Sequence, residues 1–257
     1  MELDQQIVLI SGGASGLGAA TVRRFASAGA RVGILDIDAT LGPAVAAEVG
    51  GVFVECDVGN PASVAVAFEA VVGELGPPRM LICCAGIGAG KRVVGRREPH
   101  DLELFERVVR VNLTGTFNLV RLAAWEMQQL DPFPHTGERG LIVTTSSIAA
   151  YDGVDGGVAY SASKAGVAGM TLPLARDLGP HAIRAVSIAP GSFETPLVAG
   201  MPDRFRDQLS NETPFPRRFG LPEEFAALAE HIVSNPMING EVIRLDGGLR
   251  MRPTERS

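Results

Sequence analysis

Residues that hold metal ions are scarce in this chain. It contains four histidines and three cysteines among 257 residues. The histidines are far apart in the sequence, and neither an HxxxH nor a CxxC spacing occurs, so we expect no metal site. The odd number of cysteines and the absence of an export signal argue against a disulfide framework.

Basic residues are too few for a general nucleic-acid surface. The formal net charge is −6 at pH 7, whereas such a surface needs a dense positive footprint. No apolar run approaches the roughly 20 residues that span a bilayer. Residues 1–13 also lack the basic region and cleavage site of a signal peptide. We therefore expect a cytoplasmic protein that binds neither nucleic acid nor membrane.

Apolar segments of strand length alternate with longer amphipathic segments along the chain. Strands are expected at 7–11, 31–36, 51–57, 79–85, 140–147, 184–190 and 241–246, and helices near 16–28, 40–49, 61–75, 101–130, 157–179 and 222–234. Strands that are apolar throughout and separated by helices indicate a parallel sheet covered on both faces. The pattern predicts one doubly wound α/β domain over residues 1–257, with a seven-stranded parallel sheet.

Two stretches, 86–100 and 191–221, fit neither the strand nor the helix pattern. Both follow the carboxyl end of an expected strand, where open α/β sheets bind ligands. Long irregular segments at that edge are better interpreted as substrate loops than as linkers. The second stretch carries apolar side chains that suit a hydrophobic ligand, at Phe193, Leu197, Met201, Phe205 and Phe215.

A glycine-rich turn, SGGASGLG at residues 11–18, connects the first strand to the first helix. Glycines there let the backbone approach a pyrophosphate at the helix N-terminus, although an ordinary turn is the alternative. Asp36 ends the second strand, where a carboxylate can bind the adenosine ribose or cap a helix. No basic residue follows at 37–39, which favours NAD over NADP. Asp57 contacts an adenine edge or caps the next helix, two interpretations that the sequence leaves equally open.

The segment 146–166 carries candidate acid–base chemistry. Tyr160 and Lys164 are spaced to project from one face of a helix. A phenol is a poor base at neutral pH, and a neighbouring ammonium favours its ionised form. Ser147 ends the fifth strand, where its hydroxyl can hold a substrate oxygen or cap a helix. Asn112 falls within an expected helix, where its amide can hold a water on a proton relay to Lys164.

In this combination the chain closely resembles the short-chain dehydrogenase/reductase family. The matching segments, in order, are GGASGLG, Asp36, CDV, CAG, VNLTGTF, SS, YSASK and APGSFETP. The resemblance implies a Rossmann fold and hydride transfer from a carbinol carbon to NAD. Tyr160 would be the general base, Ser147 would position the substrate oxygen, Lys164 would lower the phenol pKa and hold the nicotinamide ribose, and Asn112 would complete the relay. The positions that match cofactor-binding residues are Gly12, Ser15, Gly16, Leu17, Gly18, Asp36, Asp57, Val58, Cys84, Ala85, Gly86, Tyr160, Lys164, Pro190, Gly191, Phe193 and Thr195.

A narrower resemblance is to the type-2 3-hydroxyacyl-CoA dehydrogenases, also called 17β-hydroxysteroid dehydrogenases of type 10. The segments TPFPRRFG and NPMINGEVIRLDGGLRMRP carry it, together with the loop at 86–100. It implies NAD-dependent oxidation of 3-hydroxyacyl-CoA, including 2-methyl-branched substrates, tolerance for hydroxysteroids, and a homotetramer. Four basic residues in the loop, Lys91, Arg92, Arg96 and Arg97, either meet the phosphates of coenzyme A or are simply solvated.

Three other functions compete with this one. A hydroxysteroid or other secondary-alcohol dehydrogenase would use the same catalytic residues. An NADPH-dependent 3-oxoacyl carrier-protein reductase is disfavoured by Asp36. A non-catalytic binding or scaffold subunit would be expected to lose the tyrosine, lysine or serine, and all three are present.

The adjacent cysteines, Cys83 and Cys84, invite a reading as thiol chemistry. Successive strand residues point to opposite faces, so the two cannot jointly bind one metal ion. Neither has a basic neighbour in sequence that would make it a thiolate. We interpret both as small buried residues, with Cys84 against the cofactor and Cys83 in a place where the family usually has an asparagine.

Overall fold

Seven parallel strands form one sheet at the centre of the fold. The computed structural model describes residues 1–252. The strands are β1 (Ile7–Ser11), β2 (Arg31–Asp36), β3 (Val52–Glu55), β4 (Met80–Cys83), β5 (Gly140–Thr145), β6 (Ile183–Pro190) and β7 (Val242–Leu245). They lie in the order β3-β2-β1-β4-β5-β6-β7, and every pairing is parallel. The predicted seven-stranded parallel sheet is therefore confirmed.

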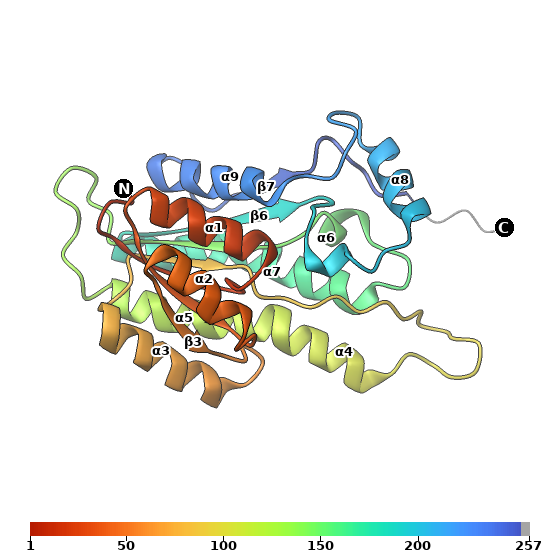
Figure 1. Ribbon diagram of the computed structural model, residues 1–257, viewed down its shortest axis with the longest axis horizontal. Helices are drawn as coiled ribbons and strands as arrows, with labels where there is room; N and C mark the ends of the chain where they lie inside the picture. Colours follow the sequence, from red (N-terminus) through yellow and green to blue (C-terminus); the bar gives the residue numbers. More distant parts are fainter. Residues whose placement is uncertain (253–257) are drawn as a thin grey trace.

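Helices cover both faces of this sheet, as predicted. They are α1 (Gly16–Ser27), α2 (Leu41–Val49), α3 (Pro61–Leu75), α4 (Leu102–Val109), α5 (Thr116–Met127), α6 (Ala149–Asp152), α7 (Val158–Leu178), α8 (Asp203–Glu212) and α9 (Pro222–Ser234). Helices α1 and α9 pack against each other on one side of the sheet, and α3 and α5 lie on the other (Figure 1).

Alternation along the strands produces two separate cores. Ile10 of β1 packs into one core with Phe25 of α1 and Phe225 of α9. Its neighbour Leu9 packs into the other core with Leu119 of α5. All five side chains are fully buried, and burial of each contributes roughly 1.5–3 kcal/mol. The strand order reverses between β1 and β4, which opens a crevice at their carboxyl ends.

The helix predicted at 101–130 is interrupted. Between α4 and α5 the chain forms a π-helical turn at Arg110–Gly115, and π-turns inside helices often occur at functional sites. The Thr116 hydroxyl donates to the Asn112 carbonyl at 2.7 Å. A Cβ on Gly115 would lie 2.5 Å from the Val58 carbonyl oxygen, so the turn packs against the segment after β3.

The two stretches predicted to be irregular differ from each other. Residues 86–100 carry only an isolated bridge between Val94 and Pro99, and the segment extends outward beside α4 (Figure 1). The prediction that residues 191–221 are wholly irregular is wrong, because they contain a short 3₁₀ turn at Pro196–Val198 and helix α8. Helix α8 lacks any fully buried residue, so no apolar periodicity announces it. Among residues 1–252, no helix is long and apolar enough to cross a membrane.

Candidate active site

Two hollows adjoin at the carboxyl edge of the sheet. One, which we call the glycine cleft, surrounds the turn after β1. The other, the tyrosine pocket, lies in front of β5 and β6. The predicted residues that line the glycine cleft are Gly12, Ser15, Gly16, Leu17, Gly18, Asp36, Asp57, Val58, Cys84, Ala85, Gly86 and Thr195. Those that line the tyrosine pocket are Ser147, Tyr160, Lys164, Pro190, Gly191 and Phe193, with Leu17, Cys84, Gly86 and Thr195 shared between the two hollows.

The glycines of the turn are required by close backbone contacts. Gly12 has a φ of +70°, and a Cβ there would lie 2.6 Å from the Ala85 nitrogen. A Cβ on Gly18 would lie 2.0 Å from the Gly12 carbonyl oxygen. Neither position can accept a side chain, because the neighbouring atoms belong to the backbone. The turn therefore leaves a cradle of main-chain atoms at the start of α1, the kind of site that holds phosphate groups.

Asp36 links β2 to the glycine-rich turn. One carboxylate oxygen accepts from the Ala14 amide at 2.9 Å, and the other accepts from the Asp38 amide at 3.1 Å. The start of α2 is held instead by Asp38, whose carboxylate accepts from Thr40 and Leu41. Asp36 is thus not the helix cap that the sequence left open. Each of its oxygens retains a lone pair that can accept a hydroxyl hydrogen bond.

Asp57 does not cap the following helix. The N-cap of α3 is Asn60, whose side chain accepts from Ala62 and Ser63, and the Asn-Pro dipeptide at 60–61 is the signal that announces it. The Asp57 carboxylate accepts from the Gly59 amide at 2.8 Å. The side chain is exposed at the rim of the glycine cleft, where an adenine contact is possible geometrically.

The adjacent cysteines face opposite sides of the sheet. Cys83 packs in the core that contains Leu119, and Cys84 packs against the core that contains Ile10. Burial raises the pKa of both thiols, that of Cys84 to about 12, so neither is a thiolate at neutral pH. Among residues 1–252, no three His, Cys, Asp or Glu side chains gather closely enough to hold a metal ion.

Ser147, Tyr160 and Lys164 meet in the tyrosine pocket. Tyr160 and Ser147 share a side-chain hydrogen bond, and the Ser147 hydroxyl also accepts from the Ala149 amide at 3.1 Å. Ser147 is therefore a pocket residue whose hydroxyl also binds the first amide of α6. Burial raises the pKa of Tyr160, and the hydrogen bond with Ser147 lowers it in part. The direction of this shift is therefore set by burial, and the lowering by Lys164 that the spacing predicted is not among its causes.

Lys164 is a buried cation with few partners. Its Nζ donates to the Thr145 carbonyl at 2.8 Å and lies 5.9 Å from the Tyr160 ring centre. Because burial disfavours the charged form, the pKa of Lys164 falls to about 8. A Cβ on Gly86 would lie 3.4 Å from this Nζ, so the lysine stands where the glycine cleft and the tyrosine pocket join.

Asn112 anchors the segment after β4. Its Oδ1 accepts from the Ile87 amide at 2.8 Å, while its Nδ2 donates to the Ile87 carbonyl and to the Ser163 hydroxyl. Both amide hydrogens are therefore used within the protein, and only a lone pair on Oδ1 is left for a water. This side chain joins the π-helical turn to Ser163 of α7, whose hydroxyl donates to the Tyr160 carbonyl.

The outer wall of the tyrosine pocket is mostly apolar. Phe193, Leu197 and Met201 line it, as the sequence predicted. Phe205 and Phe215 are absent from this lining, so their prediction as pocket residues is wrong; Phe215 is 82% exposed. Sequence reasoning missed further apolar members, which are Ala149, Val154, Val198, Leu209 and Met251.

Comparisons with known proteins agree with this arrangement. A family model described as short chain dehydrogenase matches residues 6–204. The human protein named 3-hydroxyacyl-CoA dehydrogenase type-2 is 45% identical over 251 residues, which cover 96% of each chain. The chain belongs to the short-chain dehydrogenase family.

Other relatives show how wide this similarity is. The Drosophila melanogaster 3-hydroxyacyl-CoA dehydrogenase type-2 is also 45% identical, over 96% of this chain and 98% of its own. A 3-oxoacyl-[acyl-carrier-protein] reductase from Thermotoga maritima is 34% identical, over 97% and 99%. The crystal structure of a 3-hydroxyacyl-CoA dehydrogenase type-2 from Mycobacterium avium superimposes with a TM-score of 0.91 at 40% identity, covering 97% of each chain. Membership of this family means that the chain is an oxidoreductase that acts on CH–OH groups with a nicotinamide cofactor.

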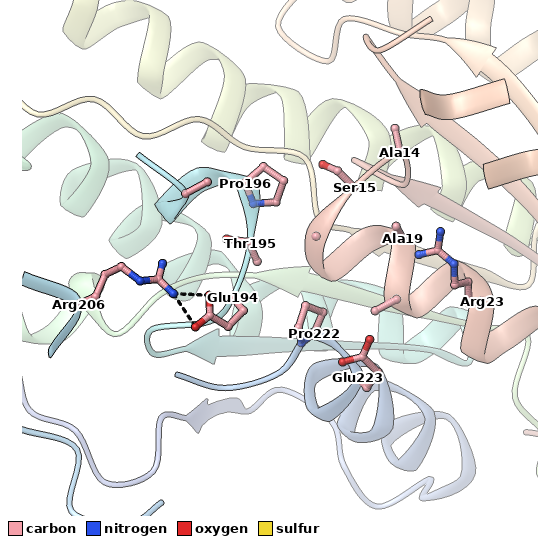
Figure 2. A pocket seen from close by; sticks show the side chains of 13 residues that line it. Ala14, Ser15, Ala19, Arg23, Glu194, Thr195, Pro196, Arg206, Pro222 and Glu223 are labelled. Atoms are coloured by element: carbon pink, nitrogen blue, oxygen red, sulfur yellow. Dashed lines mark hydrogen bonds and ion pairs between the residues drawn. The ribbon is translucent and has the colours of Figure 1, made fainter. Parts of the chain in front are cut away.

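This dehydrogenase has a further hollow on the outer side of the glycine-rich turn. Figure 2 shows it between Ser15 and Ala19 of the α1 region, Pro222 and Glu223 at the start of α9, and the segment that contains Glu194. The Arg206 guanidinium of α8 binds both oxygens of Glu194 at 2.6 Å. A Cβ on Gly16 would lie 3.3 Å from Thr195. The segment at 194–196 therefore separates this outer hollow from the glycine cleft, and an ion pair ties it to α8.

Proposed function

We propose that this dehydrogenase oxidises the 3-hydroxyl group of 3-hydroxyacyl-CoA, straight or 2-methyl-branched, to the 3-oxo thioester with NAD. The observation that carries the proposal is the junction at Gly86. There the glycine cleft adjoins the tyrosine pocket, with its buried tyrosine, serine and lysine and its apolar wall, because the two hollows share lining residues. The names of the relatives at 45% identity support the choice of substrate.

The residues of the glycine cleft fit a dinucleotide. The space that a Cβ would fill at Gly12 and Gly18 is already occupied by neighbouring backbone, so the turn stays tight at the start of α1, where a pyrophosphate can bind. Asp36 supports NAD over NADP, because its carboxylate accepts ribose hydroxyl hydrogen bonds and repels a 2′-phosphate. Once bound, the nicotinamide ring supplies the hydride acceptor. A cofactor assay in which NADP is preferred would contradict this part of the proposal.

The proton chemistry is assigned to this chain's own residues. Tyr160 takes the proton of the substrate hydroxyl through its phenolate oxygen, and Ser147 holds the same substrate oxygen while hydrogen-bonded to Tyr160. Lys164, whose Nζ lies 5.9 Å from the centre of the Tyr160 ring, stabilises the phenolate and binds the nicotinamide ribose in this proposal. Asn112 holds α7 against the segment after β4 through Ile87 and Ser163, which fixes the position of the helix that carries Tyr160 and Lys164.

The loop after β4 supports a coenzyme A thioester. The Lys91 amide donates to the Gly156 carbonyl at 2.7 Å, which places this loop beside Gly157 at the pocket. The Lys91 ammonium is paired with Glu98 at 2.8 Å. The exposed guanidinium groups of Arg92, Arg96 and Arg97 therefore remain the candidates for the phosphates of coenzyme A.

Replacing two of these arginines tests the coenzyme A assignment. Arg96→Ala/Arg97→Ala should raise KM for acetoacetyl-CoA about three- to tenfold, with less effect at high salt, because exposed pairs are weak and screened. KM for the N-acetylcysteamine thioester, which lacks the nucleotide, should stay the same. The matched control is Arg31→Ala/Arg176→Ala, two exposed arginines outside the loop. If the variant and the wild type have the same KM for acetoacetyl-CoA as well as for the N-acetylcysteamine thioester, coenzyme A is removed from the proposal.

A second candidate substrate is a hydroxysteroid or another hydrophobic secondary alcohol. The apolar wall formed by Leu197, Met201 and Leu209 would suit its ring system. A higher kcat/KM on a hydroxysteroid than on acetoacetyl-CoA would favour this alternative.

Assembly and location stay predictions. We infer a homotetramer, which is supported by large apolar side chains on the outer surfaces of α5 and α7, where Phe117, Trp125 and Leu172 are about half exposed or more. Light scattering on the purified protein would measure the mass. The cytoplasmic location rests on the sequence alone.

A further inference from the structure

The segment after β7 returns to the tyrosine pocket. We call residues 247–252 the C-terminal strap. It turns at Gly247 and Gly248, whose φ values are +61° and +83°. Leu249 is then buried, and Met251 becomes part of the pocket lining. A residue remote from the catalytic segment in sequence therefore contributes to the apolar wall.

One arginine holds the strap at this place. The Arg244 guanidinium donates to both oxygens of Asp152, at 2.9 and 2.8 Å, and to Asp246 at 2.7 Å. It also donates to the Leu249 carbonyl at 3.0 Å. A bidentate pair of this kind fixes geometry as well as supplying energy. Arg244 thus connects the end of β7, the strap and α6.

The strap is also joined to the catalytic segment directly. The Met251 amide donates to Asp152 at 3.1 Å. Asp152 ends α6, whose first turn follows Ser147, and its own amide donates to the Ile148 carbonyl at 3.0 Å. The side chain at 251 is consequently placed by the same segment that places the catalytic serine.

We propose that Met251 is a specificity-determining residue that limits the apolar length of the substrate, and that Arg244 is the positioning residue that keeps it there. The proposal rests on the proposed function for its substrate class, an acyl chain beyond the reacting carbon. Met251 is partly buried, and it belongs to the mostly apolar outer wall of the pocket. An unbranched thioether side chain adapts its shape to an apolar ligand, so truncating it enlarges the pocket without exposing a polar group.

The test measures kcat/KM over 3-hydroxyacyl-CoA substrates of increasing chain length, starting from 3-hydroxybutyryl-CoA. Met251→Ala should raise the ratio of long-chain to short-chain kcat/KM about tenfold, the scale of methylene discrimination in apolar pockets. Met251→Leu, which conserves volume, should keep the wild-type ratio. Met237→Ala is the matched control, because that methionine is 88% exposed. A long-to-short ratio in Met251→Ala within about twofold of wild type would overturn the proposal.

Arg244→Gln tests the positioning role. It should change the same length ratio in the same direction, through KM more than kcat, while Met251 itself is intact. Arg24→Gln, which breaks an ion pair between α1 and α9, controls for loss of a surface ion pair. If Arg244→Gln lowers Tm and kcat for all substrates equally, Arg244 serves only stability and the positioning claim fails.

The same series also separates this proposal from the proposed function. Simple secondary alcohols of matched length are assayed alongside the thioesters. If wild type oxidises only the alcohols, the coenzyme A assignment fails, and Met251→Ala is then judged on the alcohol length ratio. If wild type oxidises the thioesters and the long-to-short kcat/KM ratio is the same in Met251→Ala as in wild type, only the strap proposal fails.

Discussion

In the glycine cleft, main-chain atoms of different segments lie so close together that a single added carbon at Gly12 or Gly18 would overlap them. In the outer wall of the tyrosine pocket, side chains from three loops lie together, and ion pairs such as Arg244–Asp152 and Arg206–Glu194 hold those loops. The crowded backbone of the glycine cleft fixes one shape, which suits a ligand that stays the same across a family. The outer wall of the tyrosine pocket can change one side chain at a time, which is how a shared fold acquires different substrates.

Adding one methyl group to each region should give the largest contrast. Gly18→Ala should destabilise the protein by at least about 3 kcal/mol and abolish NAD binding, because the new Cβ meets backbone that cannot move aside. Gly90→Ala, where the loop after β4 lines the tyrosine pocket, has open space around its Cβ and should change neither stability nor NAD binding. Thermal unfolding and NAD titration measure both variants. Near-normal NAD affinity in Gly18→Ala would show that the turn relaxes and that the contrast is false.

This contrast also explains which parts could be predicted from sequence. Backbone crowding restricts residue type, so the glycines at 12, 16 and 18 and the acid at 36 mark their positions in the sequence. The strands were predictable because they are apolar throughout. Tyr160 and Lys164 were recognisable because a helix sets their spacing. The rise in the phenol pKa was not predictable, because it comes from burial in the folded protein.

Ion pairs between segments that are distant in sequence leave no comparable pattern in the sequence. Arg244 meets Asp152 across 92 residues of sequence, and no local pattern pairs them. Helix α8 was missed because it is polar on nearly every side. The π-helical turn at 110–115 packs against Val58 through Gly115, a tertiary contact that no local pattern marks. The two phenylalanines assigned wrongly to the pocket, Phe205 and Phe215, were chosen by hydrophobicity, which does not indicate direction.

Removing the buried cation at the junction should separate activity from stability. Lys164→Met should lower kcat/KM about 10²–10⁴-fold. It should also stabilise the unliganded protein by about 1–3 kcal/mol at neutral pH, because the folded protein no longer holds a desolvated ammonium. Chemical denaturation and steady-state kinetics measure the two effects. Lys91→Met, which changes the only other lysine, is the control.

The pH dependence of this effect has a definite sign. The folded pKa of Lys164, about 8, lies below the ordinary value of 10.5. Between these values the unfolded chain binds more protons, so wild-type stability contributed by this group should rise with pH through that window. The penalty is complete below the folded pKa. The difference between wild type and Lys164→Met should therefore shrink as the pH rises, and a constant difference would contradict a buried charge as its cause.

A smaller effect is expected from the hydrogen bond between Ser147 and Tyr160. The base form of the phenol is deprotonated, so oxidative kcat/KM should rise with pH through the alkaline range. Because this hydrogen bond lowers the pKa of Tyr160, Ser147→Ala should move the rise to higher pH. The pH profile of kcat/KM reports the shift independently of the overall loss of rate. Superimposable normalised profiles would mean that Ser147 acts on the substrate alone.

The smallest effect should come from the two cysteines beside the junction. Cys83→Ser and Cys84→Ser replace weakly polar thiols, whose pKa values burial raises, with hydroxyls of similar size. Cys83 lies near Ser11, and Cys84 lies 3.9 Å from the Thr145 hydroxyl, so both hydroxyls find a partner. Turnover should stay within about threefold of wild type, with a stability loss of about 1 kcal/mol. Cys84 touches both hollows, so Cys84→Ser should affect KM for NAD more than Cys83→Ser does. Loss of turnover with NAD binding intact would restore a chemical role for the thiols.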